Sequence, residues 1–153
     1  MSPSEIVVDQ ALRDASRMGA KPIRFPATAD HAKGDGTPCV KYINGEYHLT
    51  CEERGKVYSE FTSTSADEIR YRLASITAKD QAVLQLSPAV LLEFPRGQMK
   101  QKCEILQLEL LARVSPEWAE RRRLELYRGG STHLSRLAPD EDPPRATTSM
   151  PPP

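Results

Sequence analysis

The chain has 153 residues, a length that fits one domain with a single hydrophobic core. Its 21 basic residues balance 21 acidic ones, so no overall field draws it to nucleic acid or to an anionic membrane surface. No stretch approaches the roughly 20 apolar residues that a membrane-spanning helix needs, and we expect no membrane partner. The N-terminus lacks the basic start and apolar run of a signal peptide, and the three cysteines are widely spaced, so we expect a cytoplasmic protein.

The first segment, residues 1–33, predicts a helix followed by a loose linker. Ser4 can cap the helix and Gly19 can end it. The apolar residues that recur at helical spacing are Val8, Ala11, Leu12 and Ala15. Residues 21 to about 37 are rich in Pro, Ala, Asp and Gly, and we expect them to be loosely held.

Residues 38–62 predict a three-stranded antiparallel meander. Asn44-Gly45 favours a two-residue turn, because a type I′ turn needs positive φ at both positions. This turn pairs Tyr42 with Tyr47 and Val40 with Leu49.

The second turn, Glu53-Arg54-Gly55, is interpreted as a three-residue loop with a left-handed Gly55. It places Phe61 opposite Tyr47, on the inner face of the sheet. Tyr58 has the opposite parity and is expected to be exposed, where it is a candidate binding contact.

Three helices are expected after the sheet. Ser65-Ala-Asp-Glu68 is a capping-box pattern, and Ile69, Leu73, Ile76 and Val83 would line one face of a helix that stops near residue 86. The next helix, at about 98–114, is apolar around most of its circumference, so we expect it to be central. The last helix begins at Ser115-Pro116 and ends at Gly129-Gly130. Between the first two, residues 87–95 fit either a helical turn or an extended piece.

The fold class predicted from these elements is α+β: an N-terminal helix, a three-stranded antiparallel meander and a C-terminal group of about three helices. Residues 34–129 would form the core domain, and 130–153 a disordered tail that holds six of the thirteen prolines.

The sequence contains no motif for catalysis or for a cofactor. The three histidines are scattered without metal-ligand spacing, and no nucleophile elbow or phosphate-binding glycine loop occurs. Cys103 falls on the apolar stripe of a helix and is interpreted as a small core residue. We therefore expect no catalytic residue, no metal, no cofactor and no small-molecule substrate, so that the chain is not an enzyme.

The last helix carries two further candidate binding contacts. Trp118 is expected to pack against the central helix, with an interface anchor as the second interpretation. Arg122 lies between Trp118 and Leu126 in angle, so it must snorkel, pair internally or meet a partner, and the first two are favoured. Arg121 is expected in an outer ion-pair ladder with Glu117, Glu125 and Arg128.

Several segments together resemble the immunity protein 63 family of bacterial polymorphic toxin systems. These are DGTPCVKYINGEYHLTCEERG, the helix start SADEI, and QLELLARVSPEWAERRRLEL. The resemblance covers about residues 34–128 and is clearest over Gln107–Leu126. It implies a small protein, encoded beside a delivered toxin, that binds the cognate toxin domain inside the producing cell, and it brings no catalytic residues with it.

Three functions are therefore compared. The first is an immunity protein that neutralises a toxin by surface complementarity. The alternative is a small regulatory or nucleic-acid-binding module that uses the arginines of the last helix, although zero net charge and the splayed geometry of Arg121–Arg123 count against it. An enzyme with an unrecognised site ranks last.

Overall fold

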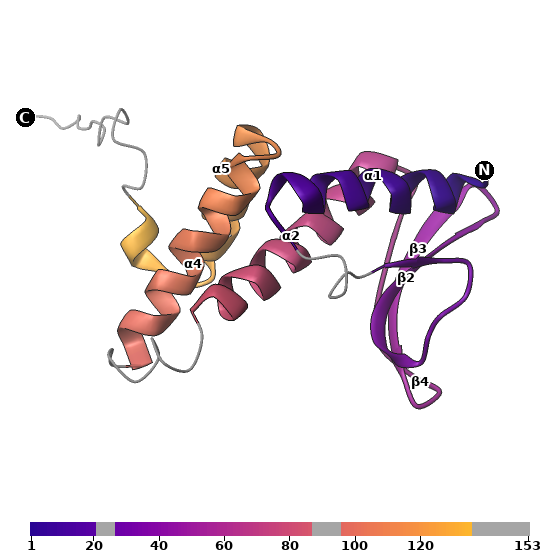
Figure 1. Cartoon of the computed structure of the whole chain (residues 1–153), viewed down its shortest axis with the longest axis horizontal. Helices are drawn as coiled ribbons and strands as arrows, with labels where there is room; N and C mark the ends of the chain where they lie inside the picture. The colour runs from indigo at the N-terminus through magenta and orange to yellow at the C-terminus, as the bar shows by residue number, and fades with distance from the viewer. Residues whose placement is uncertain (21–26, 87–95, 136–153) are drawn as a thin grey trace, which may run out of the picture.

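The computed structural model of the chain describes residues 1–20, 27–86 and 96–135. The elements follow the order α1 (Pro3–Arg17), β1 (Thr28–Ala29), β2 (Asp35–Ile43), β3 (Glu46–Glu53), β4 (Lys56–Ser63), α2 (Ala66–Gln85), α4 (Arg96–Ala112), α5 (Pro116–Arg128) and the short 3-10 helix η2 (Thr132–Leu134). The α+β class predicted from the sequence is confirmed. In Figure 1, α2 connects the sheet at one end of the molecule to α4 and α5 at the other.

The sheet in the described part of the chain has four strands in the order β1-β2-β3-β4. The predicted first hairpin is confirmed, with Tyr42 opposite Tyr47 and Val40 opposite Leu49. The expected three-stranded, purely antiparallel sheet is wrong in one respect, because β1 adds a parallel strand beside β2. A two-residue strand gives no alternating pattern, so its stretch of the sequence resembled a linker.

The second hairpin differs from its predicted register. Its turn has two residues, Arg54 and Gly55, both at positive φ (53° and 76°), as a type I′ turn requires. Phe61 consequently lies opposite Leu49 and not Tyr47, and an irregularity between Cys51 and Glu52 absorbs one residue of β4. Phe61 still reaches the inner face because a bulge shifts side-chain parity by one.

The N-cap of helix α1 lies two residues before its expected position at Ser4. Ser2 is the N-cap and forms a capping box with Glu5, whereas Ser4 is buried and donates a 2.6 Å hydrogen bond to Asp30. The buried stripe includes Val7, and Leu12, predicted to be inside, is 42% exposed. The helix is therefore rotated slightly from the orientation that its apolar spacing indicated.

Two hydrophobic clusters share helix α2. The first joins α1, the sheet and α2, and its buried members are Val7, Val8, Ala11, Val40, Leu49, Ile69 and Leu73. The second joins α2 to α4 and consists of Met18, Ala74, Ala78, Leu110 and Leu111, with Trp118 packed against it. Since α2 buries two faces, the single predicted face was incomplete. Val83, which was predicted to lie on it, is 54% exposed.

Of the C-terminal helices, α5 has its predicted bounds, and α4 begins and ends two residues before its predicted bounds. The α4 side chains Leu108, Leu110 and Leu111 are all buried, as expected of a central helix. Helix α5 is capped by the Ser115 hydroxyl, which accepts from the Trp118 backbone N–H, and it ends at Arg128.

The first residues of the predicted tail are packed against these helices. Leu134 in η2 is fully buried, and the Arg123 guanidinium donates a 2.7 Å hydrogen bond to its carbonyl oxygen. The remainder of that tail, at 136–153, and the ambiguous stretch 87–95 lie outside the described residues.

Candidate partner-binding site

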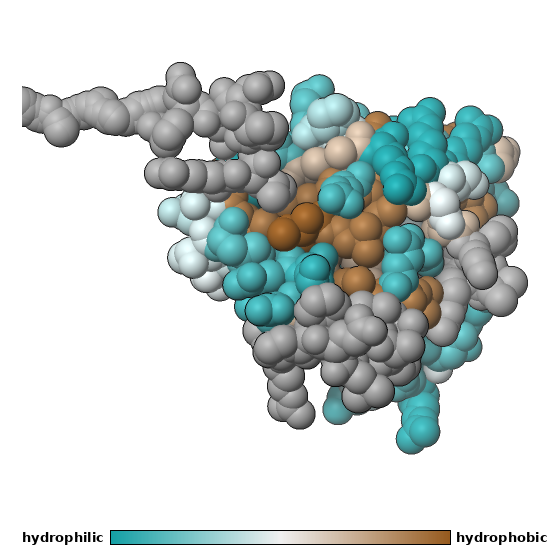
Figure 2. Space-filling view, turned by 60° about the vertical axis from the view of Figure 1, so that its left-hand side comes forward, coloured by the Kyte–Doolittle hydropathy of each residue, from teal (hydrophilic) through white to brown (hydrophobic). Residues whose placement is uncertain are grey.

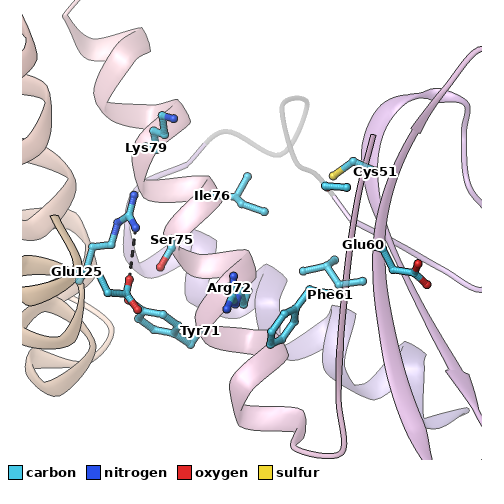
Figure 3. Close-up of a pocket in the computed structure, with 12 residues that line it drawn as sticks. Cys51, Glu60, Phe61, Tyr71, Arg72, Ser75, Ile76, Lys79 and Glu125 are labelled. Atoms are coloured by element: carbon cyan, nitrogen blue, oxygen red, sulfur yellow. Dashed lines mark hydrogen bonds and ion pairs between the residues drawn. The ribbon is translucent and has the colours of Figure 1, made fainter. Parts of the chain in front are cut away.

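A groove of about 360 Å³ opens between the sheet and the flank of α2, with α5 at its far side (Figure 3). Its walls come from four elements, the strands β3 and β4 and the helices α2 and α5. The lining residues are Leu49, Cys51, Ser59, Glu60, Phe61, Tyr71, Arg72, Ser75, Ile76, Lys79, Arg122 and Glu125.

The sheet forms the apolar wall of the groove. Phe61 and Cys51 point from the strands toward α2, and Glu60 points the opposite way (Figure 3). On that outer face the Glu60 carboxylate lies 3.5 Å from His48 Nδ1. The strand alternation therefore turns the Glu60 carboxylate away from α2, although Glu60 is itself one of the lining residues.

Helix α2 supplies the opposite wall, which is cationic at both ends. Arg72, Ile76 and Lys79 follow at helical spacing along one flank (Figure 3). The Arg72 guanidinium lies 3.8 Å from the centroid of the Phe61 ring, a cation–π contact. Lys79 is exposed. The wall thus combines an apolar centre with two positive groups open to solvent.

The polar contacts at the α5 side are satisfied inside the fold. Tyr71 donates a 2.7 Å hydrogen bond to Glu125, and burial together with this carboxylate raises the pKa of Tyr71 to about 12. Arg122 donates to Gln107 at 3.2 Å and to Glu125 at 3.3 Å. The internal pairing expected for Arg122 is therefore confirmed, and its charge is offset by Glu125.

Arg121 joins α5 to α2 through Glu68. Its two terminal nitrogens donate to the two carboxylate oxygens, one of them at 2.8 Å, and its guanidinium lies 3.8 Å from the centroid of the Tyr71 ring. These hydrogen bonds lower the pKa of Glu68. The predicted ladder contact with Glu125 exists at 3.4 Å, but the contact with Glu68 was missed. In the predicted capping box, the structure shows Ser65 accepting from the Glu68 N–H, while the Glu68 carboxylate binds Arg121.

The structure does not gather the three predicted contact residues in one place. Arg122 lines the groove, and Tyr58 is 62% exposed on β4 beside the lining residue Ser59. Trp118 is half-buried, with its ring edge-on to Tyr71 at 5.8 Å and with Arg70 5.4 Å above it. The packing role expected for Trp118 is confirmed.

The sequence did not reveal that Phe61, Arg72 and Lys79 form one surface. The spacing of Arg72 and Lys79, two helical turns apart, was visible in the sequence. Only the fold shows that Phe61 faces them, because no pattern in the sequence places β4 beside this flank of α2.

A second groove, of about 340 Å³, lies between α4 and α5, on the side where Figure 2 shows apolar side chains gathered. Its apolar lining includes Ile105, Leu108 and Ala119. Of its three charged residues, Glu120 and Arg123 form an ion pair with each other, and the third is Glu109. Nothing in this lining marks the chemistry of an occupant.

Within residues 1–20, 27–86 and 96–135, no group of three or more His, Cys, Asp or Glu side chains is placed to hold a metal ion. No helix in this part of the chain is long and apolar enough to cross a bilayer.

The fold and its surface grooves define a small α+β protein, and the comparison with known families identifies its family. The profile of the family Immunity protein 63 matches residues 44–128, more than half of the chain. The chain belongs to this family, as the resemblance in its sequence predicted. No curated protein and no solved structure matches the chain.

Proposed function

We propose that this protein binds and neutralises a cognate toxin of a bacterial polymorphic toxin system in the cytoplasm of the producing cell, without catalysing a reaction. The observation that carries the proposal is the position of the family match. Residues 44–128 contain β3, β4, α2 and α5, the four elements that build the groove. The segment shared with the immunity family therefore holds this candidate surface.

The surface around the groove has the composition of a protein interface. The aromatic ring of Phe61 lies against Arg72 in the groove, and the same edge strand also carries Val57 and Tyr58, which are 51% and 62% exposed. Aromatic residues and arginines are enriched in such interfaces, which bury about 800 Å² on each partner.

Three side chains are proposed to serve toxin binding, two as contacts and one as a support. Tyr58 would insert as an aromatic anchor because its ring is exposed on an edge strand. Arg122, half-buried at the base of the groove, would offer its remaining N–H donors. Trp118 would act mainly by holding Tyr71 and Arg70 in place beside the groove.

The test is co-expression with the toxin domain encoded by the adjacent gene. The chain should restore growth of cells that express the toxin, and the purified proteins should form an equimolar complex. Tyr58→Ala should weaken binding about tenfold or more, the loss typical of an interface anchor. Tyr127→Ala is the matched control, since Tyr127 is 41% exposed but lies on α5 and not on the edge strand, and it should bind within about twofold of wild type. A toxin that neither binds the chain nor loses activity would overturn the proposal.

The nucleic-acid-binding alternative is not favoured. Arg121 donates to Glu68, Arg122 to Gln107 and Glu125, and Arg123 to Glu120. Arginines that are already paired within the fold do not form the open basic face that phosphate binding requires.

A further inference from the structure

Strand β4 forms an open edge of the sheet. The order β1-β2-β3-β4 leaves it paired on one side only, with β3. In an antiparallel ladder, successive residues direct their backbone N–H and C=O groups alternately to one neighbour and to the other. Tyr47 follows the pair that closes the first turn, so its backbone groups point to β4, where it faces Ser63. By the same alternation Thr62 and Glu60 present theirs to the open edge.

The part of β4 that can accept another strand is short and regular. The irregularity opposite Cys51 and Glu52 separates it from the turn, and pairing is continuous from Ser59 to Ser63. Such a bulge protects the turn end of an edge from indiscriminate pairing. The regular part lies directly beside the groove, since Ser59 and Phe61 line it.

The groove beneath this edge has an uncompensated positive charge. Lys79 is exposed and has no hydrogen bond or ion pair among the described residues. Arg72 has a carboxylate, that of Glu68, only at 3.8 Å, and Glu68 already binds Arg121. Glu125 and Glu60 leave this charge in place, because Glu125 is held by Tyr71 and the Arg122 side chain while Glu60 points to the outer face.

We propose, on the basis of the proposed function, that the toxin presents an extended segment that adds to the sheet beside β4, with acidic side chains on the face turned toward α2. Strand addition satisfies the outward backbone groups of Glu60 and Thr62 and supplies affinity through the main chain. The carboxylates meet Arg72 and Lys79 and select the register of the added strand.

The spacing of the cations suits such a strand. Arg72 and Lys79 are seven helical residues apart, which corresponds to about 10 Å along α2. Side chains on one face of a strand repeat every ~6.7 Å. Acidic residues two or four positions apart therefore lie within reach of both flexible cations.

The decisive variant removes one outward backbone donor. Thr62→Pro deletes an N–H that faces the open edge and leaves the ladder with β3 intact, the one orientation in which an edge strand tolerates proline. It should weaken binding of the toxin domain by about tenfold or more. Thr62→Ala keeps the N–H and should bind within about twofold of wild type.

The charge is tested separately with a matched pair. Lys79→Glu should weaken binding about tenfold and reduce its salt dependence, whereas Lys100→Glu, on the exposed surface of α4, should leave both unchanged. Hydrogen exchange gives a readout that needs no variant: complex formation should protect the amides of Glu60 and Thr62, which the free chain leaves open. This readout also decides the matter if Thr62→Pro fails to fold.

The two proposals fail in different ways. Wild-type chain that binds no toxin refutes the proposed function, and the strand addition with it. Tight binding that survives both Thr62→Pro and Lys79→Glu, without protection of the edge amides, refutes strand addition alone.

Discussion

The ion pair between Asp14 and Arg70 allows a quantitative test of how α1 is held to α2. Asp14 is 1% exposed, and its two carboxylate oxygens accept from Arg70 Nε at 3.1 Å and from Nη2 at 2.9 Å. Asp14→Asn keeps the size of the side chain but replaces one acceptor with an amide NH₂ group. That group faces a guanidinium donor, so one of the two hydrogen bonds is lost and the other keeps only the charge of its donor.

The expected loss of unfolding free energy for Asp14→Asn is about 2–3 kcal/mol. Breaking a fully buried pair costs roughly 3–5 kcal/mol. The lower figure applies because the Arg70 side chain is 23% exposed and retains an Asp67 carboxylate at 3.6 Å. Arg70→Met in the Asp14→Asn background should recover part of this loss, since it removes the unpaired cation. The coupling energy between the two sites should be about 1–2 kcal/mol.

Urea unfolding monitored by circular dichroism measures both quantities. The slope of the free energy against urea should remain that of wild type, so that the midpoint reports stability. Arg13→Ala is a control on the same helix, because its pair with Asp9 is exposed and contributes little. A loss below about 0.5 kcal/mol for Asp14→Asn, or a coupling energy near zero, would refute the reasoning.

Three further measurements test other contacts. Because the pKa of Glu68 is lowered in the fold, its carboxylate stabilises the protein above the ordinary pKa of 4.5, and this stabilisation is lost as the pH falls through the folded pKa. Glu68→Gln should therefore lower the free energy of unfolding at pH 7 and have little effect in strong acid. Urea midpoints at the two pH values measure this, and equal losses at both would contradict it. In an alkaline titration followed by tyrosinate absorbance, Tyr71 should ionise at about pH 12, and the free energy of unfolding should fall as the pH rises from 10.0, the ordinary pKa of tyrosine, to about 12. Tyr71→Phe should remove this titration step. A titration curve that the substitution leaves unchanged would contradict the burial of Tyr71. Leu134→Ala should lower the free energy of unfolding by about 2–4 kcal/mol, because the side chain is fully buried. Thr132 is exposed, so Thr132→Ala should change that free energy by no more than about 0.5 kcal/mol in the same urea assay. Equal effects would show that η2 does not belong to the core.

Features specified by local chemistry could be predicted from the sequence. Asn44-Gly45 determined both the turn and the register of the first hairpin, because few dipeptides accept positive φ twice. The bounds of α5 followed from Ser115-Pro116 at one end and glycines at the other. The predicted exposure of Tyr58 is likewise confirmed. The three-residue turn from which its face was predicted was wrong, but the bulge at Cys51 and Glu52 offsets the shorter turn, so the predicted face was not changed.

Features that depend on distant partners could not be predicted. Glu68 matched a capping box, but Arg121, 53 residues later, binds its carboxylate. Asp14 and Arg70 are 56 residues apart, and neither one marks the other in the sequence. The second hairpin was misplaced for a subtler reason: Arg54 takes a left-handed conformation that its side chain does not favour, and the shorter turn shifts every later pair.

The candidate site shows the same division between local and distant information. The angle of Arg122 on its helix favoured snorkelling or an internal pair over a partner contact, and the structure shows a pair with Glu125. The groove itself could not be predicted, because Phe61 and Lys79 come to line one groove only when β4 and α2 have packed together.

The position of the family match separates the surface from its support. Residues 44–128 contribute the groove and the edge strand, whereas Val7 and Val40 in the first cluster, Met18 in the second, and Leu134 lie outside this segment. The flanking elements thus complete the core on which the groove rests. A binding surface that is already ordered gives higher affinity than one that orders on binding, because ordering consumes interaction energy. Substitutions in α1 that loosen the first cluster should therefore weaken toxin binding without any contact to the toxin, and by less than they lower the stability of the fold.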